Sequence, residues 1–258
     1  MDYIIFDLEF NQGYNYTKDT KNITNPKCPF EIIQIGAIKL TDNFETIGTL
    51  DVLIKPEIYT IINPFVKELT GITMDELDSG KPFKEMYKQL SEFINADSSI
   101  LCVWGLADIK ELFRNIEYHE LDTLIVPTAY INIQSYASKE LNCQKGINIG
   151  LGNAAELLGI PIENAFHNAY NDAFYTAEVF KKIYSSEIKT RIYNPHKNTR
   201  VTRPDAKNYK LDTCNLMKQF EKMFKREMTD EEKSIINLAY IMGKTNQFQV
   251  VSDPIEKK

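Results

Sequence analysis

Four acidic residues and one histidine have the types and spacing that could do chemistry. They stand in three blocks of the chain, with the carboxylates in or beside apolar runs: Asp7 and Glu9, then Asp108, then His167 and Asp172. A carboxylate buried without a partner loses its hydration at a high cost in free energy. Where several carboxylates converge, a divalent metal ion is the common remedy, because Mg²⁺ prefers hard oxygen ligands. The pattern therefore indicates a metal site.

The first block predicts a buried strand that carries two acids on one face. Its sequence, residues 4–10, is Ile-Ile-Phe-Asp-Leu-Glu-Phe. Residues two apart in a strand project from the same face, so Asp7 and Glu9 point the same way. The alternative is an edge strand with one solvated face. The almost wholly apolar surroundings favour a central strand.

The second block predicts a buried strand, residues 99–104, that ends at Gly105 and is followed by a helix over 107–117. Asp108 falls in the first turn of that helix. An acid at this position also complements the helix dipole, so on its own it has an ordinary structural explanation.

The third block places a histidine before a helix and an acid within its opening turns. His167 and Asp172 are five residues apart, and on one helix they would point about 140° away from each other. We therefore expect His167 in the preceding loop and Asp172 near the start of an amphipathic helix over 171–185.

In this order the blocks resemble the DEDDh group of DnaQ-like 3′-to-5′ exonucleases, which have a ribonuclease H-like fold. Asp7-Leu8-Glu9 matches the first motif, Asp108 the second, and the five-residue step from His167 to Asp172 the third. The segments 31–37, 69–73 and 151–161 resemble the family between these motifs. The resemblance covers residues 1 to about 187, and Asp7-Leu8-Glu9-Phe10 is most similar to the enhanced-RNAi and KapD-like branch.

This resemblance implies a two-metal hydrolysis of phosphodiester bonds. Two Mg²⁺ or Mn²⁺ ions would be held by the four carboxylates, Asp7, Glu9, Asp108 and Asp172. His167 would be the general base that takes a proton from the attacking water. An imidazole suits that role because its unperturbed pKa lies near 6.5.

Three residues are predicted to contact substrate. Phe10 directly follows the acids, and an aromatic ring there could stack on a terminal base. The alternative for Phe10 is a buried strand residue. By the same resemblance, Gly71 and Ile72 lie near that base.

The coarse pattern predicts an α/β domain over residues 1–188, with a mixed five-stranded sheet flanked by helices. A long loop is expected over 11–29. The predicted strands are 2–10, 30–40, 46–55, 99–104 and 122–133, and the predicted helices are 64–69, 83–95, 107–117, 134–142, 150–158 and 171–185.

Residues 189–258 read as a basic connector followed by a helical hairpin. Residues 1–188 carry 15 Lys and Arg against 27 Asp and Glu, a net charge of −12, whereas residues 189–226 carry 11 against 3, a net charge of +8. The basic segment either binds phosphates through counterion release or is a solvated linker. The hairpin either packs on the core or binds a protein partner.

The composition fits a cytoplasmic enzyme. The chain has no apolar stretch of about 18 residues and no secretory pattern, so we expect no membrane partner. Four scattered cysteines include no Cys-x-x-Cys pair, which argues against a zinc site and for reduced thiols.

We therefore expect a metal-dependent 3′-to-5′ exonuclease that acts on single-stranded ends, with RNA favoured over DNA by the finer resemblance. Two alternatives remain open. One is a proofreading exonuclease recruited by a polymerase, and the other is a regulatory module that binds a protein through residues 189–258.

Overall fold

A mixed six-stranded sheet forms the centre of the first compact unit, Met1–Asn198. The computed structural model describes residues 1–13, 24–94, 98–144, 146–195 and 213–244. The strand order is β3-β2-β1-β4-β5-β6, in which β1 pairs antiparallel with β2 and parallel with β4. The strands are β1 (Asp2–Gln12), β2 (Phe30–Leu40), β3 (Thr46–Leu53), β4 (Ser99–Val103), β5 (Ala129–Asn132) and β6 (Arg191–Ile192).

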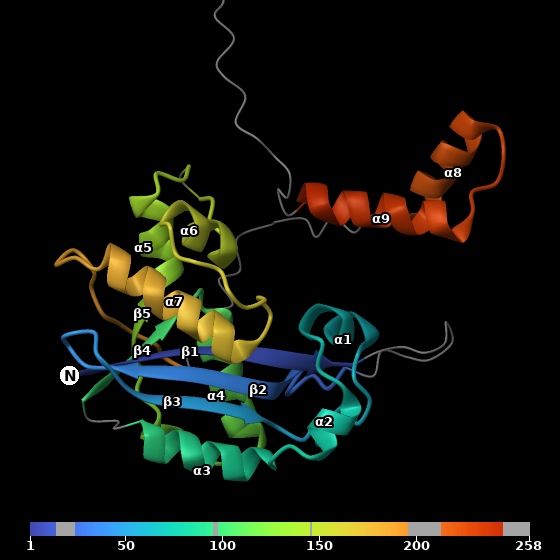
Figure 1. Ribbon diagram of the computed structural model, residues 1–258. Helices are drawn as coiled ribbons and strands as arrows, with labels where there is room; N and C mark the ends of the chain where they lie inside the picture. Colours follow the sequence, from blue (N-terminus) through green and yellow to red (C-terminus); the bar gives the residue numbers. More distant parts are fainter. Residues whose placement is uncertain (14–23, 95–97, 145, 196–212, 245–258) are drawn as a thin grey trace, which may run out of the picture. The chain divides into compact units, whose positions relative to one another are not determined.

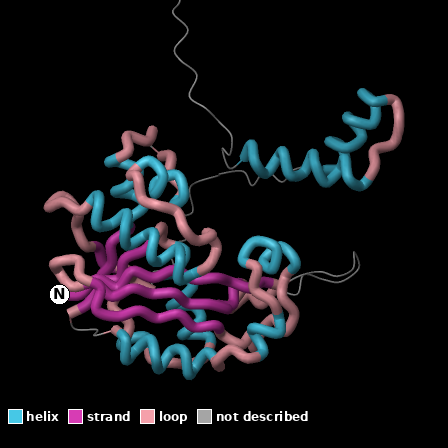
Figure 2. The backbone as a smooth tube through the Cα atoms, in the orientation of Figure 1, coloured by secondary structure: helices cyan, strands magenta, loops and turns pink. Residues whose placement is uncertain are grey.

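Helices cover both faces of this sheet (Figures 1 and 2). One face packs against α3 (Phe83–Phe93) and α4 (Ala107–Tyr118), and the other packs against α5 (Ile133–Glu140), α6 (Leu151–Leu157) and α7 (Ala169–Ile183). The period-two alternation of β1 decides which side chain meets which layer. Ile4, Phe6 and Leu8 join the α3–α4 core, while Tyr3 and Ile5 join the α5–α7 core.

The sheet has one strand more than the five that we expected. The extra strand, β6, contains two residues and pairs antiparallel with β5, and a strand this short leaves no periodic pattern in the sequence. Because β6 lies beyond residue 188, the first compact unit extends past the domain boundary that we expected, to Asn198.

Short elements account for the other differences. Between α1 (Pro64–Thr70) and α3 lies a further helix, α2 (Met74–Asp78), that the periodicity did not predict. The strand expected over 122–133 divides into a 3₁₀ turn, Thr123–Ile125, and β5, with Pro127 between them. Most of the loop expected over 11–29, residues 14–23, lies outside the described residues.

The second compact unit, Thr199–Lys258, contains the two expected helices, α8 (Thr213–Phe224) and α9 (Asp230–Lys244). The predicted capping box before α9 is present, because the Thr229 hydroxyl accepts from the Glu232 N–H and the Glu232 carboxylate accepts from the Thr229 N–H. Most of the basic connector, residues 196–212, lies outside the described residues. Within the part of the chain that is described, no helix is long and apolar enough to cross a bilayer.

Candidate active site

The first two acids lie on a strand that is paired on both sides. Asp7 is opposite Gly36 of β2 and Glu9 is opposite Gln34, while β4 flanks β1 on its other edge. The edge-strand alternative is therefore wrong. Asp7 is partly buried and Glu9 is 8% exposed. Both alternate with the residues that face α3 and α4, so their side chains project towards the α7 layer.

Asp108 reaches the same end of the sheet from α4. Strands β1 and β4 are parallel, so their carboxyl ends lie at one edge. Gly105 makes the turn from β4 into α4 with a φ of 103°, a conformation that side chains other than glycine rarely adopt. Asp108 follows in the first helical turn, as predicted, and is 7% exposed.

The third block begins its helix two residues earlier than predicted. Helix α7 starts at Ala169, because the Asn168 side chain accepts hydrogen bonds from the main-chain N–H groups of Tyr170 and Asn171. His167 lies in the preceding loop as expected, exposed and in the left-handed region with a φ of 65°. Its main-chain N–H donates to Asp172 Oδ2 at 3.1 Å.

Gly36 brings this helix onto the sheet. A Cβ atom at this position would lie 2.2 Å from the carbonyl carbon of Ala169 and 2.2 Å from the nitrogen of Tyr170. Only glycine allows that main-chain approach. Gly36 was not predicted to have a role. A glycine inside an apolar strand was the available signal, since it marks a close approach of another backbone.

The three blocks converge at this edge. One ligand atom each from Glu9, His167 and Asp172 lie within 4.8 Å of one another. Asp108 and Asp7 belong to the same group of charges, because the charges of Asp108 and Asp172 raise the pKa of Asp7 as well as that of Glu9.

All four carboxyl groups have pKa values above their ordinary range. Burial is the largest cause in each case. It raises the pKa of Glu9 to about 8, with further contributions from the charges of Asp172 and Asp108. The pKa of Asp108 rises to about 7 through burial and the Asp172 charge. Four carboxylates so arranged repel one another, and a divalent cation would remove the repulsion.

The donor set fits such a cation. Asp172 Oδ1 is buried, and no hydrogen-bond donor in the described part of the chain reaches it. A buried carboxylate oxygen without a partner is costly unless a ligand satisfies it. The other carboxylates, those of Asp7, Glu9 and Asp108, also offer oxygen ligands, which suits Mg²⁺ or Mn²⁺.

A family model described as exonuclease, RNase T, matches residues 4–180, from the first strand to within α7. The chain belongs to this exonuclease family. It is therefore a nuclease of the hydrolase class, and its α/β architecture is that of ribonuclease H-like exonucleases. Members of the family use divalent metal ions, and the Glu9, His167 and Asp172 group is a possible site for one.

Curated relatives include the "DNA polymerase III PolC-type" of Streptococcus pneumoniae, strain R6, which is 27% identical over 177 residues. The match covers 69% of this chain but 11% of the polymerase, so the chain spans a small part of that relative.

Three solved structures share the fold. The nuclease domain of 3′hExo, described as a DEDDh family member bound to rAMP, has a TM-score of 0.60 and 21% identity, covering 75% of this chain and 96% of that one. A 3′-exonuclease described for recognition of a histone mRNA stem-loop has a TM-score of 0.58 and 18% identity, covering 75% and 74%. Escherichia coli exonuclease I with a dA16 oligonucleotide has a TM-score of 0.53 and 18% identity, covering 70% and 40%.

Next to the carboxylate cluster lies an open groove of about 730 Å³. Gly71 and Ile72, two of the predicted substrate contacts, line it together with Gln34 and Asn168. Gly71 ends α1 in the left-handed conformation and is exposed, whereas the Ile72 side chain is largely buried beside α1 and α2. The groove thus connects the α1–α2 turn with the start of α7.

Phe10 is not brought to the acids. It is partly buried against the α3–α4 core and meets Phe30 edge to face, with 6.2 Å between ring centroids. Because Phe10 alternates with Glu9, it lies on the opposite face of β1. Helix α1, which ends at the groove residue Gly71, exposes two apolar side chains one helical turn apart, Phe65 and Leu69, 63% and 41% exposed. Their four-residue spacing was the available signal.

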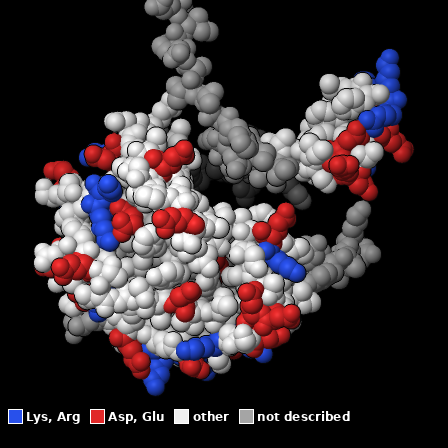
Figure 3. All heavy atoms as spheres, viewed as in Figure 1, with Lys and Arg blue, Asp and Glu red and all other residues white. Residues whose placement is uncertain are grey.

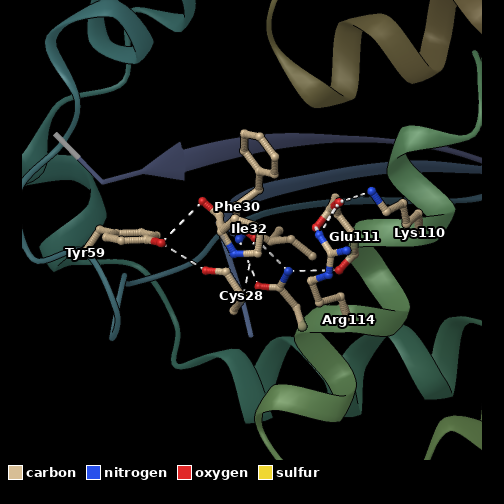
Figure 4. A network of polar contacts seen from close by, with 9 residues as sticks. Cys28, Phe30, Ile32, Tyr59, Lys110, Glu111 and Arg114 are labelled. Carbon is tan, nitrogen blue, oxygen red and sulfur yellow. Dashed lines mark hydrogen bonds and ion pairs between the residues drawn. The ribbon is translucent and has the colours of Figure 1, made fainter. Parts of the chain in front are cut away.

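The two basic residues near Asp108 already have an acidic partner. Lys110 and Arg114 flank Glu111, one turn after Asp108 on α4, as Figure 4 shows. Arg114 Nη1 lies 2.7 Å from Glu111 Oε1, and Lys110 Nζ lies 3.4 Å from it. The Glu111 charge also contributes to the raised pKa of Asp108.

A buried clamp at the carboxyl end of β1 and the beginning of β2 holds the segment that leads into α1. Asn11 donates to the carbonyls of Tyr59 and Ile61 and accepts from Asn63 N at 2.9 Å. Its cross-strand partner, Glu31, accepts from three successive main-chain N–H groups, those of residues 57, 58 and 59. Neither residue was predicted to have a role. Their signal was a polar residue at a buried strand position, the same signal that singled out Asp7.

Proposed function

We propose that this chain is a metal-dependent exonuclease that removes nucleotides from the 3′ end of single-stranded nucleic acid. The observation that carries the proposal is the convergence of Glu9, His167 and Asp172, with ligand atoms within 4.8 Å of one another. These residues come from a central strand, a loop and a helix start far apart in the sequence, so their meeting is a property of the fold.

Each polar side chain then has a role. Asp7, Glu9, Asp108 and Asp172 hold two divalent ions, Mg²⁺ or Mn²⁺. When bound, these ions supply charge neutralisation at the phosphate and lower the pKa of the attacking water. The exposed His167 imidazole takes the proton from that water. The first turns of α4 and α7 face the same edge, and the positive ends of their helix dipoles favour an anionic substrate there.

The groove supports binding of a single strand end. Gly71 provides main-chain groups without a side chain in the way. Helix α1, which ends at Gly71, exposes the Phe65 ring, on which a base can stack. We propose RNA ahead of DNA. The Asp7-Leu8-Glu9-Phe10 motif supports this order, and so do the similar structures with rAMP and for a histone mRNA stem-loop. The structure with dA16 supports DNA as the substrate.

A single assay tests the proposal. The full-length protein is incubated with 5′-labelled single-stranded RNA and DNA, with Mg²⁺, with Mn²⁺ or with chelator, beside Asp7→Asn. We expect stepwise shortening from the 3′ end that requires both the metal and Asp7. Absence of shortening of either strand with every metal would contradict the exonuclease proposal, and the ratio of RNA to DNA rates decides the substrate class.

Proofreading for a DNA polymerase is the second candidate, favoured by the similarity to the PolC-type polymerase. A mismatched primer terminus distinguishes the two. A proofreading enzyme removes the mismatched 3′ nucleotide of a DNA duplex faster than a matched one, whereas the RNA-directed enzyme prefers a single RNA strand.

The segment after residue 188 supports two further proposals. The exposed Met223, Phe224 and Ile235 of α8 and α9 offer an apolar surface for a protein partner. The basic residues of 189–226, with a net charge of +8, are proposed to bind phosphates. The first unit is acidic by contrast (Figure 3), so this segment concentrates the positive charge. Deletion of residues 189–258 should then flatten the salt dependence of substrate binding, and an unchanged dependence would remove the phosphate-binding proposal.

A cytoplasmic location fits the free thiols of Cys28, Cys102 and Cys143.

A further inference from the structure

Gln34 is a buried amide in the middle of β2, between the apolar residues Ile33 and Ile35. It is 3% exposed and lies opposite Glu9 on the neighbouring strand. Its Oε1 accepts a hydrogen bond from the main-chain N–H of Ala169 at 3.2 Å, and its Nε2 donates to Asp51 Oδ1 of β3 at 2.9 Å. One side chain therefore joins the strand beside the metal site to the first residue of α7.

Helix α7 needs this contact. The first four N–H groups of a helix have no partner within the helix. Here the Asn168 side chain accepts from Tyr170 N and Asn171 N, and the Asn168 carbonyl accepts from Asp172 N. Among the N–H groups of residues 169–172, that of Ala169 remains; this residue is buried, and Gln34 is the acceptor of its N–H. At the helix start that carries Asp172, the Ala169 N–H thus has its acceptor only with Gln34 in place.

Asp51 determines which way the Gln34 amide points. An ionised carboxylate only accepts hydrogen bonds, so it draws the NH₂ end of the amide and leaves the carbonyl end for Ala169. The reverse orientation would place NH₂ against N–H and carbonyl oxygen against carboxylate. Both residues line the groove with Asn168, and Gln34 is the cross-strand partner of Glu9.

We propose that Gln34, oriented by Asp51, is the positioning residue that holds the start of α7 so that Asp172 and His167 face Glu9. The proposal rests on the proposed exonuclease function for its catalytic consequence, but not for its structural one. Gln34 does not touch the reacting atoms in this role, and it acts through the main chain of α7.

Charge exchange between the two positions tests the pairing. Gln34→Glu keeps an acceptor for Ala169 but sets a carboxylate against Asp51. Asp51→Asn alone keeps an acceptor for the Gln34 amide and serves as the matched control. In the double variant, the new amide at position 51 donates to the new carboxylate at position 34, so the hydrogen bond is restored with donor and acceptor reversed.

In the full-length protein at saturating Mn²⁺, we expect Gln34→Glu to lower kcat about tenfold with little change in KM. Asp51→Asn should stay within about twofold of wild type, and the double variant should recover to within about threefold. Hydrogen exchange of the peptide spanning residues 167–172 gives a readout without activity. Exchange should be faster in Gln34→Glu and return towards wild type in the double variant.

Two results would overturn the proposal. One is wild-type kcat and exchange in Gln34→Glu, whether or not its melting temperature falls. The other is a double variant as impaired as Gln34→Glu. A wild-type protein inactive on every substrate would count against the exonuclease proposal alone, because the order of exchange rates in the same four proteins still tests the Gln34 contact.

Discussion

The main-chain N–H of His167 donates to Asp172 Oδ2 over 3.1 Å, so the two residues of the third motif are joined through backbone and not through the imidazole. The imidazole stays available for proton transfer. The second carboxylate oxygen, Oδ1, is buried with no donor among the described residues and stays available for a metal ion. The two proposed roles, proton transfer by the His167 imidazole and metal binding by Asp172 Oδ1, thus belong to atoms that the hydrogen bond between these residues does not use.

This separation predicts the effect of replacing His167. The substitution His167→Asn keeps the main-chain hydrogen bond and suits the left-handed φ of 65°, which asparagine tolerates. We expect kcat to fall about 100-fold or more, as for loss of a general base, with Mn²⁺ affinity almost unchanged. Calorimetric titration with Mn²⁺ and single-turnover kinetics measure the two quantities. A parallel loss of both would show that the imidazole is a metal ligand.

The raised carboxyl pKa values predict how pH acts on the metal-free protein. Glu9 in the folded protein has a pKa of about 8 and Asp108 one of about 7, against ordinary values near 4 in the unfolded chain. The folded state therefore binds more protons between these limits, and its stability falls as the pH rises from about 4 to about 8.

We expect the melting temperature of the chelated protein to decrease by several degrees from pH 5 to pH 8. Metal ions require the ionised carboxylates, so the stabilisation by Mn²⁺ should grow over the same range. Scanning calorimetry with and without Mn²⁺ measures both trends. A melting temperature of the chelated protein that stays constant or rises with pH would contradict the prediction.

Gly36→Ala tests the approach of α7 to the sheet. The new methyl group would meet the Ala169 main chain at 2.2 Å, so we expect a loss of about 3 kcal/mol in the free energy of unfolding and weaker metal binding. Gly48→Ala is the matched control, because its nearest neighbour is the Phe93 ring edge at 3.1 Å, which can rotate away. Equal losses in the two variants, by urea denaturation, would argue against a special contact at Gly36.

Glu31→Gln tests the clamp that leads into α1. The carboxylate accepts from three main-chain N–H groups, and an amide would turn a donor towards one of them. We expect a loss of about 2 kcal/mol in stability and a higher KM, because α1 and Gly71 lose their fixed position. Glu57→Gln changes an exposed acid in the same segment and should do neither. Unaltered stability in Glu31→Gln would dismiss the clamp.

The secondary-structure positions of the acids could be predicted because each lies in a local pattern. Asp7 and Glu9 interrupt an apolar strand, and Asp108 lies in the first turn of the helix after a strand, whereas their roles as metal ligands stay predictions. Gln34 was missed because its partner, Ala169, is 135 positions away, and no local spacing reports such a pair. Phe10 was predicted to contact the substrate, although the alternation of side chains along the strand already places it on the face opposite Glu9. The short α2 and β6 contain too few residues to show a period.

Gly36 also has a mechanical consequence. Gly36 lies on β2 directly opposite Asp7 of β1, and at this position the main chain of β2 meets the main chain of the helix that carries Asp172, with no side chain of residue 36 between them. Main-chain atoms have no side-chain rotamers, so the distance between β2 and α7 at this contact does not depend on how the apolar side chains of the two cores pack. The spacing of the carboxylates is thereby insulated from substitutions in the interior, and the apolar residues around them are free to vary while the distance that catalysis depends on stays the same.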